Sequence, residues 1–157
     1  MPEVEHAKSL HFFWPIVKNR EIDVTPLIHQ LLSKNKDIIL PVVLSFGEAK
    51  KGEHRMDHRL YDGETYLIPN RWGIMEPVNK QSFPLGQLDA VIVPALGVDT
   101  HGTRLGYGKG YYDEFLAQCD CPFICPTYSE CLLDNLPALP HDIPVDIIVT
   151  EKEVIRL

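Results

Sequence analysis

Residues 104–113 read Arg-Leu-Gly-Tyr-Gly-Lys-Gly-Tyr-Tyr-Asp, and no other stretch of the chain says as much about fold and function. Its three glycines are Gly106, Gly108 and Gly110. Glycine lets backbone N–H groups approach a ligand closely, and the N-terminus of a following helix favours an anion. The decapeptide therefore predicts a cradle for phosphate oxygens, to which Arg104 and Lys109 add positive charge. Asp113, at its end, is a carboxylate suited to a metal ion that bridges phosphates.

The flanks of this glycine-rich loop support that interpretation. An apolar run at 90–94 predicts a buried strand before the loop, and 111–118 predicts a helix after it. In open α/β sheets, ligands bind at the carboxyl ends of strands, which is where such a loop falls. The spacing is neither that of a P-loop nor that of a dinucleotide-binding fingerprint. A plain glycine-rich turn remains the alternative, although such a turn needs neither the two tyrosines nor the two cations.

The rest of the chain alternates apolar strands with amphipathic helices. Strands are predicted at 10–16, 38–43, 122–126, 146–150 and 154–157, with a weaker strand region at 60–68 and a polar loop or hairpin at 45–58. Thr25 followed by Pro26 predicts a helix with a hydroxyl cap, ending near Asn35. This alternation indicates an α/β fold of three layers around a mostly parallel sheet.

Composition narrows the class of protein. A chain of 157 residues has the size of one domain with a single substantial core. The net charge of −7 gives no basic field for nonspecific nucleic-acid binding. No apolar run approaches the roughly 20 residues of a membrane helix and no signal peptide opens the chain, so a cytoplasmic protein is expected. The four cysteines lack zinc-site spacing, and free thiols are expected, with Cys125 in the core.

With the loop placed, the chain resembles the 5-formyltetrahydrofolate cyclo-ligase family. The family signature matches residues 99–113, Asp-Thr-His-Gly-Thr-Arg-Leu-Gly-Tyr-Gly-Lys-Gly-Tyr-Tyr-Asp. Shorter matches are Glu-Ile-Asp at 21–23, Leu-Pro-Val-Val at 40–43 and Trp-Gly-Ile-Met-Glu-Pro at 72–77. The resemblance covers nearly the whole chain and implies a fold similar to that of the NagB/RpiA/CoA-transferase-like proteins.

The resemblance also implies an activity. Members of this family close the formyl group of 5-formyltetrahydrofolate onto N10, giving 5,10-methenyltetrahydrofolate, while ATP becomes ADP and phosphate and Mg²⁺ is required. ATP phosphorylates the formyl oxygen, N10 attacks the activated carbon, and phosphate leaves. The implied partner is a reduced folate, with no nucleic acid and no membrane, and the protein is expected to be a monomer or a homodimer.

Matched residue by residue, the family's site falls on the following positions. The residues implied in catalysis are Arg104, Lys109 and Tyr112. Those implied in ATP binding are Arg104, Gly106, Gly108, Lys109, Gly110 and Tyr111. Those implied in folate binding are Glu21, Met56, Trp72, Tyr111 and Tyr112, and those implied in metal binding are Asp113 and Asp146.

The residues alone leave plainer readings open for several of these positions. Either tyrosine is equally compatible with core packing at a helix start, and Trp72 with a buried loop anchor. Glu21 reads also as an acid near a helix N-terminus, and Asp146 as the start of a strand.

The sequence departs from the family pattern at its start. Family members normally begin with an additional helix whose Lys and Arg residues contact ATP, whereas here the match starts near Ala7. We therefore expect one domain over residues 1–157 without that helix, and weakened ATP affinity, since each lost contact to a charged group costs about 1.5 to 3 kcal/mol. A shortened, non-catalytic homologue that binds folate or nucleotide in a regulatory role is the alternative. An enzyme acting on sugar phosphates or acyl groups through the same anion cradle is a third reading.

Overall fold

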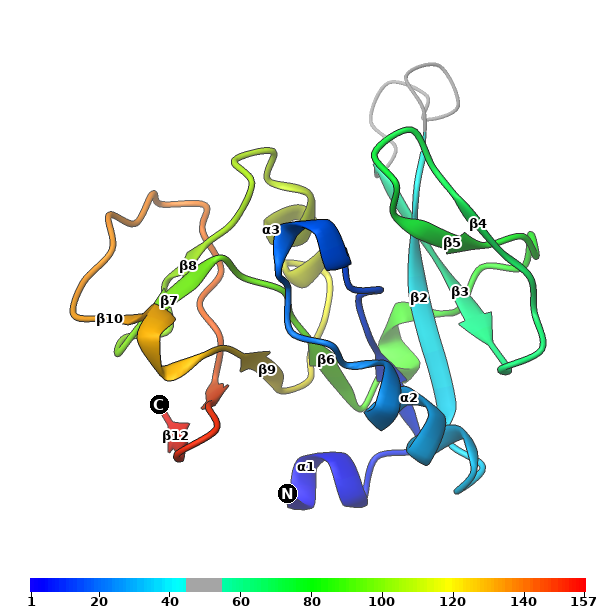
Figure 1. The fold of residues 1–157 in the computed structure, drawn as a ribbon, viewed down its shortest axis with the longest axis horizontal. Helices are drawn as coiled ribbons and strands as arrows, with labels where there is room; N and C mark the ends of the chain where they lie inside the picture. Colours follow the sequence, from blue (N-terminus) through cyan, green and yellow to red (C-terminus); the bar gives the residue numbers. More distant parts are fainter. Residues whose placement is uncertain (45–54) are drawn as a thin grey trace.

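The computed structural model of the protein describes residues 1–44 and 55–157, which are built around one seven-stranded sheet (Figure 1). Its strands, in order across the sheet, are β12 (Val154–Arg156), β11 (Ile147–Val149), β9 (Phe123–Pro126), β6 (Ala90–Ile92), β1 (Ser9–His11), β2 (Asp37–Val43) and β3 (Met56–Tyr61). The five inner strands are parallel, and the two edge strands β12 and β3 pair antiparallel. The predicted α/β class with a mostly parallel sheet is confirmed.

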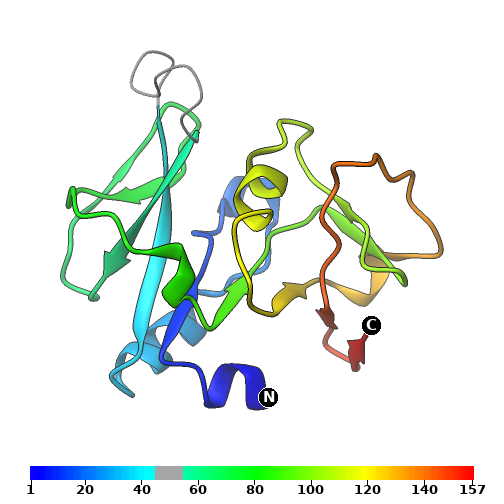
Figure 2. The same ribbon diagram turned by 180° about the vertical axis from the view of Figure 1, so that it is seen from behind.

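The sheet is apolar on both faces, which gives three layers. On β2, the side chains of Ile38 and Leu40 enter one core cluster with helix α2 (Thr25–Leu32). Ile39, between them, enters a second cluster with helix α3 (Tyr111–Leu116), because successive side chains on a strand point to opposite faces. α2 lies in front of the sheet in Figure 1 and α3 lies on the side seen in Figure 2.

Smaller elements surround this sheet. A three-stranded sheet contains β7 (Gly97–Asp99), β8 (Arg104–Leu105) and β10 (Leu132–Leu133), and a two-stranded one contains β4 (Leu67–Pro69) and β5 (Met75–Pro77). Helix α1 (Pro2–Glu5) precedes β1, and 3-10 turns span Val17–Asn19, Leu85–Gln87 and Ser129–Cys131. No helix within the described part of the chain has the length and apolar character that crossing a membrane requires.

Several expected boundaries are wrong in detail. The strand expected at 10–16 ends at His11, and the helix expected at 111–118 ends at Leu116. The glycine loop does not follow the buried strand β6 directly, because β7 and β8 intervene. Of the loop or hairpin expected at 45–58, residues 45–54 lie outside the described part, while β3 begins at Met56 and completes an antiparallel pair with β2.

The cap of α2 also differs from the prediction. Thr25 is the first helical residue rather than the cap, and the N-cap residue is Val24. Asp23 supplies the acceptor at the start of the helix: its Oδ1 accepts hydrogen bonds from the Thr25 N–H at 3.0 Å and from the Thr25 hydroxyl at 2.6 Å. Asp is as good a partner for these orphan donors as the predicted hydroxyl. The expectations of free cysteines and of a fully buried Cys125 are confirmed.

Candidate functional site

The turn between β7 and β8 is organised by Asp99, the first residue of the family signature. Its side chain is 1% exposed and its Oδ1 accepts the N–H groups of His101 and Thr103, both at 2.9 Å. Its Oδ2 accepts the N–H of Leu136 at 2.8 Å. Burial raises the pKa of Asp99, but these main-chain donors outweigh burial and bring the pKa below its usual value. Asp99 thus holds the turn and a distant segment in place as a carboxylate.

Gly102, in the same turn, permits the close approach of the segment that leads to β11. Its φ is +86°, and a Cβ at this position would lie 2.5 Å from the carbonyl oxygen of Val145. The Gly102 carbonyl in turn accepts the Val145 N–H at 3.0 Å. Only glycine fits this arrangement, and it brings residues 142–145 against the β7–β8 hairpin.

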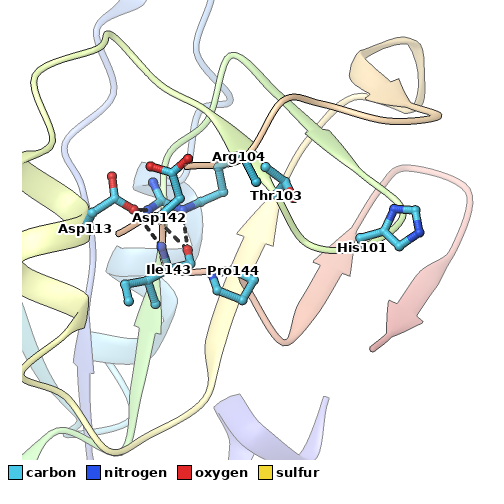
Figure 3. Close-up of a pocket in the computed structure, with 8 residues that line it drawn as sticks. His101, Thr103, Arg104, Asp113, Asp142, Ile143 and Pro144 are labelled. Carbon is cyan, nitrogen blue, oxygen red and sulfur yellow. Dashed lines mark hydrogen bonds and ion pairs between the residues drawn. The ribbon is translucent and has the colours of Figure 1, made fainter. Parts of the chain in front are cut away.

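A cavity of about 270 Å³ forms where these segments meet α3 (Figure 3). Arg104 lies in it with a side chain only 6% exposed, and its Nη2 is 2.6 Å from Oδ1 of Asp113. The same oxygen accepts the Ile143 N–H at 3.0 Å. Arg104 and Asp113, predicted as a phosphate-binding cation and a metal-binding acid, are therefore brought together as a largely buried ion pair.

The second acidic residue in this cavity is Asp142, which the sequence interpretation had passed over. Its side chain lines the same cavity as that of Asp113 (Figure 3), and its Oδ2 accepts the Leu139 N–H at 2.7 Å. Asp146 does not line the cavity. Its Oδ2 instead accepts the Phe123 N–H at 2.7 Å, where β9 begins. This hydrogen bond engages one carboxylate oxygen of Asp146, and its role as a metal ligand with Asp113 stays a prediction.

Asp146 has a structural counterpart elsewhere in the sheet. Asp89 also stands one residue before a strand, and its Oδ2 accepts the Ser9 N–H at the start of the neighbouring strand at 3.0 Å. Both carboxylates thus satisfy the first N–H of an adjacent parallel strand. An Asp directly before an apolar strand was the available signal for this role.

Lys109 and Trp72 meet on the other side of the glycine loop. Trp72 lies in the turn between β4 and β5 and is 36% exposed. Lys109 Nζ lies 4.6 Å from the centre of the Trp72 ring, and the guanidinium carbon of Arg71 lies 4.0 Å from it. A predicted phosphate-binding cation therefore contacts a predicted folate-binding aromatic residue.

Glu21 reaches the same loop from the segment before α2. Its Oε1 accepts the hydroxyl of Tyr107 at 2.8 Å, and its Oε2 accepts the Ile16 N–H at 2.7 Å. Asn19 Nδ2 donates to the Tyr107 hydroxyl at 3.0 Å. Burial and the bond to Glu21 raise the pKa of Tyr107, so the phenol stays protonated at neutral pH. Sequence analysis assigned no role to Tyr107, because its partner Glu21 lies 86 residues away along the chain.

The two tyrosines at the start of α3 differ in surroundings. Tyr111 is half-buried and stacks under the guanidinium of Arg55, whose carbon is 4.4 Å from the ring centre. The Tyr112 hydroxyl is buried and has no hydrogen-bond partner among the described residues. Burial raises the pKa of Tyr112 well above its usual value. Its phenol can therefore donate a hydrogen bond but does not act as a base at neutral pH.

Met56 lies away from the exposed parts of the site. Its side chain is 6% exposed and packs in the core cluster beneath α3. Core packing accounts for Met56 in this conformation, and its contact with folate stays a prediction.

A site built to bind a metal ion alone is absent from residues 1–44 and 55–157, where no group of three or more His, Cys, Asp or Glu side chains is arranged as ligands. Mg²⁺ seldom needs such a cage, because it keeps several waters and takes one or two carboxylates together with substrate phosphates. Asp113 and Asp142 share one cavity beside Arg104, and both hydrogen bonds to Asp113 fall on Oδ1. This donor set fits a magnesium ion carried by a nucleotide.

Comparison with known proteins finds relatives over nearly the whole chain. The sequence profile of the 5-formyltetrahydrofolate cyclo-ligase family matches residues 1–151. The 5-formyltetrahydrofolate cyclo-ligase of Haemophilus influenzae is 32% identical over 153 residues, which cover 94% of this chain and 78% of the relative. That of Escherichia coli K12 is 34% identical over 139 residues, covering 85% of this chain and 74% of the relative.

Two solved structures share the fold. The NMR structure of Aquifex aeolicus 5,10-methenyltetrahydrofolate synthetase superposes with a TM-score of 0.81 at 35% identity, over 99% of this chain and 75% of that one. The Mycoplasma pneumoniae 5,10-methenyltetrahydrofolate synthetase superposes with a TM-score of 0.62 at 26% identity, over 90% of this chain and 72% of that one.

Proposed function

The chain belongs to the 5-formyltetrahydrofolate cyclo-ligase family, and on that premise we propose that it converts 5-formyltetrahydrofolate to 5,10-methenyltetrahydrofolate, with ATP turned to ADP and phosphate. The observation that supports assigning this activity to particular residues is that two features meet at the glycine loop. On one side of the loop lies the cavity of Arg104, Asp113 and Asp142, and on the other the contact between Lys109 and Trp72.

ATP is assigned to the loop and the cavity. The N–H groups of Gly106, Gly108 and Gly110 supply donors for phosphate oxygens, and Lys109 supplies an exposed positive charge. A chain with a net charge of −7 needs such a local cluster of cations to attract a polyanion. Mg²⁺, held by Asp113 and Asp142, would neutralise charge on the phosphates. Arg104 holds Asp113 in place through their ion pair.

The folate is assigned to the surface between the loop and the β4–β5 turn. Trp72 offers an aromatic face to the pterin, and Glu21 offers carboxylate oxygens to ring N–H groups. The Tyr112 hydroxyl is buried without a hydrogen-bond partner among the described residues, and its contact with the folate stays a prediction. Phosphoryl transfer needs the formyl oxygen within about 3 to 3.5 Å of the γ-phosphorus. Because Lys109 touches Trp72, ligands on these two residues would be adjacent, as that transfer requires.

A direct assay tests the proposal. The protein is incubated with 5-formyltetrahydrofolate and Mg·ATP, and the methenyl chromophore is followed together with ADP release. The expected result is one ADP for each methenyl product. Absence of product at high enzyme concentration, while the folate still binds, would refute the catalytic assignment.

The remaining features of the proposal concern the setting of the enzyme. We propose that residues 1–157 act as one domain, that the partner is a reduced folate, and that the enzyme is a cytoplasmic monomer or homodimer. Light scattering after size-exclusion chromatography distinguishes the two oligomeric states, and a larger assembly contradicts both.

A further inference from the structure

One arginine outside the residues assigned above touches the glycine loop and the first turn of α3 together. The Nη1 of Arg55 donates to the Lys109 carbonyl oxygen at 2.9 Å. Its Nε lies 2.7 Å from Oε2 of Glu114, and its guanidinium carbon lies 4.4 Å from the centre of the Tyr111 ring. A Cβ built on Gly110 would be 3.7 Å from its Nη2. Arg55 therefore reaches residues 109, 110, 111 and 114 with one side chain.

The bond to the Lys109 carbonyl has a geometric consequence for the next residue. A trans peptide unit is planar, and its C=O and N–H point in opposite directions. A carbonyl of Lys109 held towards Arg55 therefore aims the N–H of Gly110 away from Arg55. That N–H is one of the donors assigned to the phosphates, and it sits where the loop enters α3.

The loop needs an external support of this kind. Three glycines in five residues leave the unfolded and unbound loop with many backbone conformations, and binding must restrict them. A Cβ added to Gly106 or Gly108 would meet no heavy atom of residues 1–44 and 55–157 within 4 Å, so these residues do not confine the two glycines on that side. The planar guanidinium of Arg55, stacked on one ring and bonded at two of its edges, supplies a fixed reference for the end of the loop.

We propose that Arg55 is a positioning residue for the nucleotide: it fixes the peptide plane between Lys109 and Gly110, so that the Gly110 N–H is aimed at the phosphates before ATP arrives. This inference rests on the proposed function, because it takes the glycine loop as the ATP site. It assigns Arg55 to the support of the loop, because Nε and Nη1 are both engaged by protein atoms.

Arg59 provides a matched control on β3, the strand that begins directly after Arg55. Its Nε lies 2.8 Å from Oδ2 of Asp57, and its Nη1 donates to the Asn79 carbonyl at 2.7 Å. Arg59 thus makes one ion pair and one carbonyl bond, as Arg55 does, but towards a different segment. A general loss of β3 stability affects Arg59→Ala and Arg55→Ala alike, whereas a loss of loop geometry affects Arg55→Ala alone.

The test combines steady-state kinetics with NMR of the free protein. In Arg55→Ala and Arg55→Lys, we expect KM for ATP to rise about tenfold or more, as loss of a charged hydrogen bond predicts, with KM for the folate changed less than about twofold. Arg59→Ala keeps both constants. Without nucleotide, the amides of Gly108 and Gly110 exchange faster with solvent in Arg55→Ala than in the wild type or in Arg59→Ala.

Each remaining outcome overturns an identifiable step. Restoration of KM by Arg55→Lys shows that only the positive charge matters and refutes positioning by the planar fork. Wild-type turnover combined with equal effects of Arg55→Ala and Arg59→Ala refutes the inference and leaves the proposed function standing. A wild-type protein that neither binds nor hydrolyses Mg·ATP refutes the proposed function, and the nucleotide role of Arg55 with it.

Discussion

Replacement of Asp113 by Asn separates the structural role of this carboxylate from its proposed role towards magnesium. Its Oδ1 accepts bonds from Arg104 and Ile143, and Arg104 is only 6% exposed. The asparagine amide oxygen can still accept both bonds, so what disappears is the charge opposite a buried guanidinium. We expect the free energy of unfolding to fall by about 2 kcal/mol, below the 3 to 5 kcal/mol of a fully broken buried pair.

The expected loss is measurable by melting temperature. For a domain of this size, about 2 kcal/mol corresponds to a decrease of roughly 4 to 8 °C. In the wild type, Mg·ATP at 100 times its Kd adds about 2.7 kcal/mol and raises the melting temperature by several degrees. We expect the Asp113→Asn variant to melt at this lower temperature and to show no rise in melting temperature with Mg·ATP.

Two neighbouring aspartates serve as controls. Asp142→Asn keeps the acceptor for the Leu139 N–H, and the ion pair of Arg104 is with Asp113, so this variant should melt within about 2 °C of the wild type yet lose the Mg·ATP response. Asp146→Asn keeps the acceptor for the Phe123 N–H and should retain that response. A wild-type melting temperature and a wild-type Mg·ATP response in Asp113→Asn would refute the reasoning. So would a lost response in Asp146→Asn with a normal response in Asp142→Asn.

Three further predictions concern other parts of the chain. Gly108 has a φ of +76°, so Gly108→Ala should cost about 1 to 2 kcal/mol of loop strain and raise the Kd for Mg·ATP about tenfold, as measured by calorimetry. Gly106→Ala should have the smaller effect, because φ at Gly106 is not positive. A larger effect of Gly106→Ala contradicts a preformed loop. In a fluorescence titration, Trp72→Phe should keep the affinity for the folate within about threefold, whereas Trp72→Ala should lower it tenfold or more. The reason is that an aromatic contact contributes about 0.5 to 1.5 kcal/mol beyond the area that it buries. Equal affinity of the two variants contradicts stacking. Burial, together with the charge of His58, holds the pKa of His11 well below its usual range, so below about pH 6.5 the unfolded chain binds a proton that the folded chain does not. The free energy of unfolding therefore keeps its full contribution from His11 above that pH and falls by about 1.4 kcal/mol at pH 5.5. His11→Leu should abolish this loss when unfolding is measured in urea. An unchanged pH dependence in the variant would show that His11 takes up no proton on unfolding.

The sequence by itself determined the class of fold and the family. Apolar runs such as 38–43 and 90–92 specify strands buried on both faces, because local hydrophobicity and β-branched side chains act over a few residues. The glycine loop was recognisable because its composition is unusual and lies within one short stretch. Family membership followed from the same stretch and is confirmed by the comparisons.

What only the tertiary structure decided is which side chains face one another. Asp142 and Asp146 are four residues apart in an acidic, proline-containing segment, and no local pattern indicates that Asp142 lines the cavity with Asp113. Arg55 lies 54 residues along the chain from Lys109, whose carbonyl it holds. Trp72, in the β4–β5 turn, contacts Lys109 in the loop that follows β8, a strand of a different sheet. Local sequence patterns set the conformation of each segment, whereas these contacts depend on how the chain packs between segments, which only the folded structure shows.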